Sequence, residues 1–153
     1  MNRRIVLAQR PQGEPTADCF RLESAPMPAP GSGEVLLRTR FLSLDPYMRG
    51  RMSEGPSYAE PVEVGQVMCG GTVCQVEQSL APNIKVGDVV LAYTGWQEFA
   101  AVPAAGVRKL DAALAPLSWH LGVLGMPGMT AYVGLLDIGR PASGETVVVA
   151  AAT

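Results

Sequence analysis

The sequence has few residues of the kinds that form disulfides or metal sites. Its 153 residues include three cysteines, Cys19, Cys69 and Cys74, and one histidine, His120. An odd number of cysteines without CxxC spacing, and an N-terminus without a secretory signal, predict free thiols in a reducing cytoplasm. We expect these thiols to be small buried apolar residues. His120 has no cysteine or histidine at ligand spacing, so we expect a packed or half-exposed imidazole and no zinc site.

A strong charge of one sign is lacking as well. The chain carries 12 basic and 14 acidic side chains, with a formal net charge of −2. A nucleic-acid-binding surface needs a clustered basic face, and basic residues lie close together here only in pairs such as Arg3-Arg4 and Arg49/Arg51. No apolar run reaches the roughly 18 residues of a membrane-spanning helix. We therefore expect no nucleic-acid partner, no membrane insertion and a cytoplasmic protein.

Turn-forming residues are abundant, with 13 prolines and 17 glycines, and they predict short elements. Alternating and β-branched stretches predict strands over 5–8, 19–24, 34–44, two pieces within 62–76, 88–93, and 98–102 leading to 107–110. Gly70-Gly71 marks a bulge or bend between the two pieces within 62–76. Many short strands separated by turns predict a closed or partly open β-barrel over residues 1–116.

The pattern becomes helical after residue 116. Ser118 is a candidate cap for a short helix that runs to residue 124. The segment Met126-Pro127-Gly128 is expected to break it, and a second helix is expected over 129–138. Gly139 and Pro141 then end that second helix. Residues 117–140 are therefore predicted to be connecting helices.

The end of the chain, Thr146–Thr153 (TVVVAAAT), is an unbroken apolar run that predicts a strand buried on both faces. Strands of this kind belong to parallel sheets, which need crossover connections. None follows Thr153, so we expect residues 141–153 to be the start of a truncated dinucleotide-binding domain. The alternative is a buried edge of the preceding domain.

Three ordered motifs carry a family resemblance: LSLDPYMRGRM over 42–52, VGDVVLAYTGWQEF over 86–99 and GMPGMTAY over 125–132. Together they resemble the zinc-independent medium-chain dehydrogenase/reductases, in the branch of prostaglandin reductases, plant double-bond reductases and curcumin reductase. The resemblance implies a mainly β fold with some α, in which a GroES-like barrel packs against a Rossmann domain. It also implies a homodimeric, NADPH-dependent enzyme that reduces the C=C bond of an α,β-unsaturated ketone or aldehyde.

The same segments depart from the zinc-dependent relatives. Where those enzymes place a cysteine ligand after the long strand, this chain has Asp45-Pro46-Tyr47. Where they carry a Gly-His-Glu run, it has Gly65-Gln66-Val67, and residues 75–116 contain no cysteine for a structural zinc loop. We therefore expect no bound metal.

Two aromatic residues are candidate substrate-binding residues. The Tyr47 phenol could donate a hydrogen bond to a substrate oxygen or to cofactor ribose, and its alternative role is to hold the loop after the long strand. Trp96 could line an apolar substrate pocket, and its alternative role is structural. Arg49 and Arg51 could face a cofactor phosphate, or pair with surface carboxylates. No catalytic residue is assigned.

The resemblance places Met126, Pro127, Gly128 and Thr130 beside the nicotinamide of NADPH. The alternative for this segment is an ordinary Pro-Gly joint between helices, and Tyr132 on the same helix is expected to be in the core. Further core candidates share apolar character within predicted strands: Val35, Leu37, Val89, Leu91 and Phe99.

The phosphate-binding glycine loop of the family would follow Thr153. We therefore expect this chain alone to bind no NADPH and to have no reductase activity. Two alternatives stay open for function. One is a quinone reductase of the same superfamily, and the other is a non-enzymatic GroES-like binding or assembly module.

Overall fold

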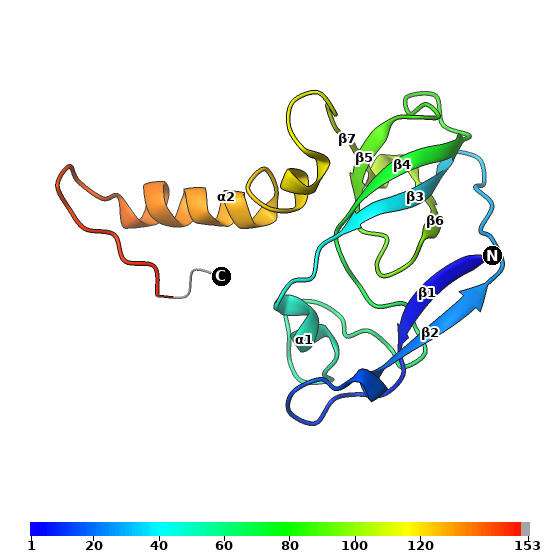
Figure 1. The fold of residues 1–153 in the computed structure, drawn as a ribbon, viewed down its shortest axis with the longest axis horizontal. Helices are drawn as coiled ribbons and strands as arrows, with labels where there is room; N and C mark the ends of the chain where they lie inside the picture. The colour runs from blue at the N-terminus through cyan, green and yellow to red at the C-terminus, as the bar shows by residue number, and fades with distance from the viewer. Residues whose placement is uncertain (151–153) are drawn as a thin grey trace.

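The structure, a computed structural model, describes residues 1–150 and consists mainly of short strands (Figure 1). The strands are β1 (Asn2–Leu7), β2 (Phe20–Ala25), β3 (Glu34–Leu42), β4 (Thr72–Ser79), β5 (Val89–Ala92), β6 (Phe99–Pro103) and β7 (Arg108–Lys109). The helices are η1 (Ala17–Cys19), α1 (Tyr47–Arg51), η2 (Ala104–Gly106), η3 (Leu117–Leu121), α2 (Met126–Tyr132) and the π-helical η4 (Val133–Gly139).

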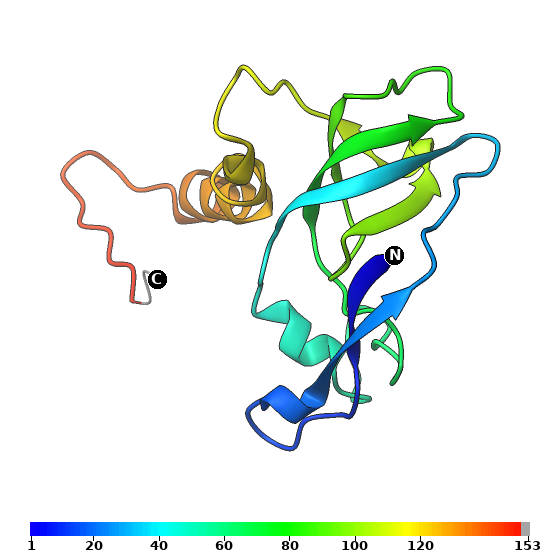
Figure 2. The same ribbon diagram turned by 45° about the vertical axis from the view of Figure 1, so that its right-hand side comes forward.

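The strands form two antiparallel sheets that do not close on each other. One sheet contains β1 and β2, and the other has the order β6-β3-β4-β5-β7. Isolated bridges from Arg4 to Gln97 and from Val6 to Val67 join β1 to the segments that precede β6 and β4. Figure 2 shows the β1–β2 pair beneath the larger sheet. The prediction of a mainly β fold with a partly open barrel is confirmed.

Two apolar clusters form the core. The first lies against the five-stranded sheet and contains Val35, Leu37, Cys74, Val76, Ile84, Val90 and Ala92. The second joins β1 to α1 and contains Leu7, Met48, Met52, Val62 and Met68. The core predictions for Val35 and Leu37 are confirmed, whereas Val89, Leu91 and Phe99 are half-buried. Cys19 and Cys74 are buried as predicted, and Cys69 is half-buried.

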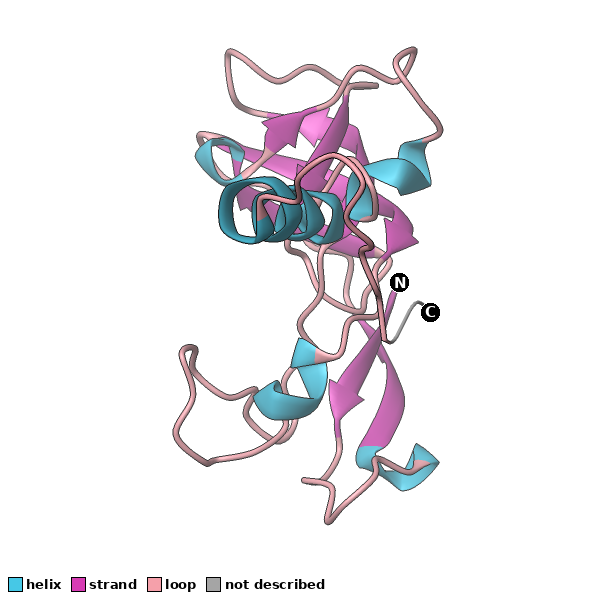
Figure 3. Ribbon diagram, turned by 90° about the vertical axis from the view of Figure 1, so that its left-hand side faces the viewer, coloured by secondary structure: helices cyan, strands magenta, loops and turns pink. Residues whose placement is uncertain are grey.

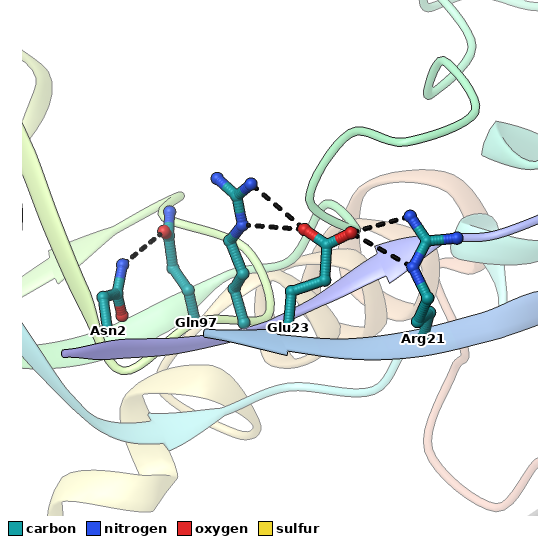
Figure 4. A network of polar contacts seen from close by, with 5 residues as sticks. Asn2, Arg21, Glu23 and Gln97 are labelled. Atoms are coloured by element: carbon teal, nitrogen blue, oxygen red, sulfur yellow. Dashed lines mark hydrogen bonds and ion pairs between the residues drawn. The ribbon is translucent and has the colours of Figure 1, made fainter. Parts of the chain in front are cut away.

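Polar side chains hold β1 against its neighbours (Figure 4). The buried Asn2 amide donates to the Phe99 carbonyl at 2.8 Å and accepts the Phe99 N–H at 2.9 Å, which links β1 to β6. Glu23 on β2 accepts hydrogen bonds from Arg21 on the same strand and from Arg4 on β1. These two guanidinium groups hold the pKa of Glu23 below its ordinary value. The bonds of Asn2 therefore link the small sheet to β6, whereas the ion pairs of Glu23 lie within the small sheet.

Gly95 is required where the chain passes close to Met68. Its φ is +73°, in the left-handed region, and a Cβ there would overlap the Met68 carbonyl oxygen and lie 3.3 Å from Val67 Cγ1. The same contact is fixed by a hydrogen bond from Trp96 N–H to the Met68 carbonyl at 2.8 Å. A side chain at residue 95 would therefore push apart the two loop segments that contain Gly95 and Met68, beside the second cluster.

Gly95→Ala is expected to lower the free energy of unfolding by about 3 kcal/mol, because backbone strain and steric overlap add. Urea denaturation followed by circular dichroism measures this loss. Gly13→Ala is the matched control, since its φ is +83° but no atom lies within 4 Å of the added Cβ. The control should lose about 1 kcal/mol, from strain alone. Equal losses for both variants would contradict the proposed overlap.

The structure corrects two expectations in the first 116 residues. The first strand piece predicted within 62–76 is only an isolated bridge at Val67. Val62 and Met68 lie in the loop between α1 and β4, and both side chains are buried. Their burial explains why a segment that forms no strand contains apolar residues. Helix α1, which was not predicted, forms because it buries Met48 in the second cluster.

The helices after residue 116 also differ from the prediction. The first is the 3₁₀ helix η3, whose N-cap is Pro116 without a side-chain bond, so the prediction that Ser118 caps it is wrong. Helix α2 begins at Met126 rather than 129, because Pro127 fits the first turn, where its missing N–H is not needed. The helix then continues as η4 to Gly139.

Residues 126–150 extend away from the sheets (Figure 1), and Figure 3 shows the helix of this segment end-on. Tyr132 is 61% exposed, so the prediction that it lies in the core is wrong. Residues 146–150, the described part of the predicted strand over 146–153, are not in a strand, because no neighbouring strand pairs with them in the described chain. The last part of that prediction lies outside the described residues. No helix within residues 1–150 is long and apolar enough to cross a membrane.

Candidate functional site

A small cavity lies where the sheet, α1 and the two C-terminal helices meet. Its volume is about 30 Å³. Its walls come from the loop after β3, the start of β4, β5 and the loop after it, η3 and the first residue of α2. The lining residues are Ser43, Asp45, Tyr47, Gly71, Leu91, Tyr93, His120, Leu121 and Met126.

The loop between β3 and α1 positions Tyr47. Ser43 Oγ donates to Asp45 Oδ1 at 2.9 Å, and the Asp45 carbonyl accepts the Met48 N–H at 3.1 Å. Pro46 has φ −56° and ψ −31°, which is already helical, so α1 begins directly at Tyr47. Proline favours this φ because its ring restricts the backbone. The DPY segment thus places the phenol at the cavity.

The phenol of Tyr47 stays protonated near neutral pH. Burial raises its pKa above the ordinary value, and Cys69, Asp45 and Tyr93 add to the rise, whereas Arg51 opposes it. Burial also raises the pKa of the Cys69 thiol, against the opposing charge of Arg51. A neutral phenol can donate a hydrogen bond to a ligand oxygen.

Gly71 lies between two other walls of the cavity, which are formed by Leu121 and Tyr93. A Cβ at this residue would lie 3.6 Å from Leu121 Cδ2 and 3.6 Å from Tyr93 Cε1, which are ordinary contacts. Tyr93 itself is largely exposed at the rim. The cavity is therefore closed by apolar contacts on one side and bordered by two phenols.

The start of α2 is fixed by close backbone packing. A Cβ at Gly128 would overlap the Val123 carbonyl oxygen and lie 2.9 Å from Val123 Cα. The Gly128 N–H bonds to the Gly122 carbonyl at 3.1 Å. Thr130 Oγ1 donates to the Met126 carbonyl at 2.8 Å. This packing sets the position of Met126 relative to η3.

The structure brings some of the predicted site residues together and separates others. Tyr47 and Met126 line the same cavity, and Pro127, Gly128 and Thr130 follow Met126 on α2. Trp96 lies elsewhere, stacked on Phe20 with ring centroids 5.3 Å apart. It lines a second, largely apolar pocket of about 250 Å³ beside β1.

The two arginines of the motif do not pair with carboxylates among residues 1–150. Arg49 donates to the Gly13 carbonyl at 2.7 Å and to Ser53 Oγ at 2.8 Å, so it fastens the loop after β1. Arg51 Nε is buried and has no hydrogen-bond partner in the described chain. Arg51 therefore acts on Tyr47 and Cys69 through its charge.

Sequence reasoning missed several residues of the cavity. Asp45 and Tyr93 lie within motifs that resemble the family, so the motifs were the available signal. His120 was expected to be packed or half-exposed; it is buried, and it also lines the cavity. No signal in the sequence connects it with Tyr47. In the part of the chain that the structure describes, no group of three or more acidic, histidine or cysteine residues could hold a metal ion.

Comparison with known proteins identifies the family. A family model described as the N-terminal domain of oxidoreductase matches residues 3–110. The NADPH-dependent curcumin reductase of Escherichia coli (strain K12) is 58% identical over 152 residues, which are 99% of this chain and 44% of the relative. The NADP(+)-dependent 2-alkenal reductase of Nicotiana tabacum is 37% identical over 158 residues, 99% of this chain and 46% of the relative.

A solved structure agrees with these relatives. The crystal structure of CurA from Vibrio vulnificus in complex with NADPH has a TM-score of 0.88 and 56% identity, covering 94% of this chain and 42% of that chain. The chain thus spans less than half the length of the relatives that it matches. It belongs to the oxidoreductase N-terminal domain family, in the zinc-independent branch of the medium-chain dehydrogenase/reductases.

Proposed function

We propose that this chain is the substrate-side part of an NADPH-dependent reductase of the C=C bond in α,β-unsaturated ketones and aldehydes. The observation that carries the proposal is the match of nearly the whole chain to an NADPH-dependent curcumin reductase and a 2-alkenal reductase. The cavity beside Tyr47 supports it, because a neutral phenol meets apolar walls there.

The residues at the start of α2 fit a nicotinamide nearby. Gly128 packs so closely on Val123 that no side chain could be present, and Met126 reaches the same cavity as Tyr47. Met126, Pro127, Gly128 and Thr130 would hold the nicotinamide end of NADPH, which supplies the hydride for the β-carbon when bound.

Tyr47 would hold the carbonyl end of the substrate. Its phenol donates a hydrogen bond to the carbonyl oxygen, where negative charge develops as the β-carbon is reduced. Leu91, Leu121 and Met126 contact the carbon skeleton and limit access of water. Trp96 lines a separate pocket, so its proposed role is to bind an apolar end of a longer substrate.

The coding DNA after codon 153 and the activity of its full product test the proposal. A glycine-rich continuation and NADPH oxidation with an enone as substrate would support it. Faster oxidation with quinones than with enones would favour a quinone reductase. A stop codon directly after residue 153 would favour a binding or assembly module.

Tyr47→Phe in the complete protein is expected to lower kcat/KM for an enone about tenfold, since one hydrogen bond to the developing charge is lost. Initial rates of NADPH oxidation measure the effect. Tyr58→Phe is the matched control, because Tyr58 is 86% exposed and does not line the cavity. If the Tyr47 variant is as active as the Tyr58 variant, the role of Tyr47 is to hold the loop after β3 and not to bind the substrate.

We also infer that the complete protein is a cytoplasmic homodimer. The three free cysteines are consistent with a reducing compartment. Light scattering after size-exclusion chromatography of the complete protein tests the dimer, and cell fractionation tests the compartment. A monomer, or a membrane-associated fraction, would contradict the respective inference.

A further inference from the structure

His120 is a buried polar residue that the proposed function leaves without a role. It lies in η3 and is 5% exposed. Its Nε2 has no hydrogen-bond partner among residues 1–150. Buried side-chain nitrogen atoms are almost always hydrogen-bonded, because burial removes their bonds to water. An exception of this kind calls for a functional explanation.

The position of His120 indicates what the imidazole could bind. It lines the same cavity as Tyr47, and the volume of about 30 Å³ suits a single oxygen atom with its nearest substituent. The one carboxylate in the lining, that of Asp45, accepts a hydrogen bond from Ser43. The lining also contains the phenols of Tyr47 and Tyr93 and the apolar side chains of Leu91, Leu121 and Met126.

We propose that His120 is a second hydrogen-bonding residue of the substrate site, whose imidazole N–H donates to the carbonyl oxygen of the bound enone or enal. The class of substrate rests on the proposed function. Together with Tyr47, His120 would give that oxygen two donors from separate elements, α1 and η3. Two aligned donors stabilise negative charge on an oxygen more than one does. Nε2 is covered by protein atoms in this structure, so donation from this atom requires the imidazole ring to turn.

Nuclear magnetic resonance of this chain tests the proposal without any turnover. The sequence has one histidine, so ¹⁵N-histidine labelling gives imidazole signals that belong to His120 alone. Titration with 2-cyclohexen-1-one is expected to shift these signals saturably. Cyclohexene, which has the same ring without the carbonyl, should leave them unchanged. No saturable shift with the enone, or equal shifts with both ligands, overturns the proposal.

Substitutions provide a second readout in the complete protein. His120→Phe keeps a planar ring without a donor, and KM for the enone should rise about tenfold, the loss expected for one hydrogen bond. His120→Gln restores a donor and should recover part of the affinity. A purely structural histidine would give equal KM values in the two variants, which overturns the proposal.

A variant outside η3 covers the case in which His120→Phe fails to fold. Gly71→Ala adds a methyl group in ordinary contact with Leu121 and Tyr93, so the fold should persist while the cavity narrows. It should abolish the enone-dependent shift of the His120 signals, and an unchanged shift overturns the proposed location. If the enone shifts the His120 signals of this chain but the complete protein has no reductase activity, the proposed function is rejected and the proposed carbonyl-binding role of His120 stands. Full activity with no shift would reject the role of His120 alone.

Discussion

Replacing Gly128 with alanine is expected to lower kcat/KM of the reductase activity proposed for the complete protein about 100-fold, the scale at which a shift of about 1 Å in a positioning element reduces rates. A Cβ at this residue would overlap the Val123 carbonyl oxygen, which is backbone and has no rotamer to adopt instead. The start of α2 must therefore move away from η3. Met126 moves with it and loses its place in the cavity beside Tyr47.

Gly134→Ala is the control for this prediction. Gly134 lies further along the same helical segment, in η4, and no atom lies within 4 Å of its added Cβ. Its kcat/KM should equal that of the unmodified protein. Circular dichroism of both variants checks that the sheets stay folded, since neither glycine belongs to the core clusters. Equal kinetics for the two variants would show that the contact with Val123 does not position the site.

This chain alone is expected to show no saturable binding of NADPH at micromolar concentrations. The residues proposed to contact the cofactor lie at the start of α2 and reach only its nicotinamide end. Most of the affinity for a dinucleotide comes from a glycine-rich loop and a helix N-terminus that bind the pyrophosphate. The resemblance places that loop after residue 153, so the loss relative to the complete protein should exceed 1,000-fold, about 4 kcal/mol.

Cofactor fluorescence during titration of NADPH into the purified chain measures this binding. The complete protein, titrated in the same buffer, is the control and should saturate. Saturable micromolar binding to the chain alone would mean that the first turn of α2 and the residues near Tyr47 hold the cofactor by themselves. The proposed division of the cofactor site between two parts of the protein would then be wrong.

Local sequence patterns were sufficient for most of the strands. β3 and β5 were predicted from runs of β-branched and apolar residues. Such runs can be recognised in the sequence because apolar residues recur at regular positions along a strand that faces a core. Helix α1 was missed because its five residues, YMRGR, include a glycine and two arginines and show no helical repeat of apolar residues. Its conformation depends on the burial of Met48 against Leu7 and Val62, which are distant in sequence.

The candidate site was predictable only in part. Tyr47 was named for the hydrogen-bonding capacity of its phenol and Met126 from the resemblance, and the structure places both at one cavity. Trp96 was named as an aromatic residue that could line an apolar pocket, but its stacking on Phe20 depends on the pairing of β1 with β2 and places it at another pocket. His120 was predicted to be packed or half-exposed, and only the contact of η3 with β3 shows that it lines the small cavity.

The sequence by itself determined the strand-rich fold and the family, because both depend on residues that are neighbours along the chain. The tertiary structure alone decided which side chains share the cavity. Gly71 on the way into β4, Tyr47 on α1 and His120 on η3 meet because antiparallel register and close glycine contacts bring distant segments together. These are long-range packing constraints, and no local pattern of residue types encodes them.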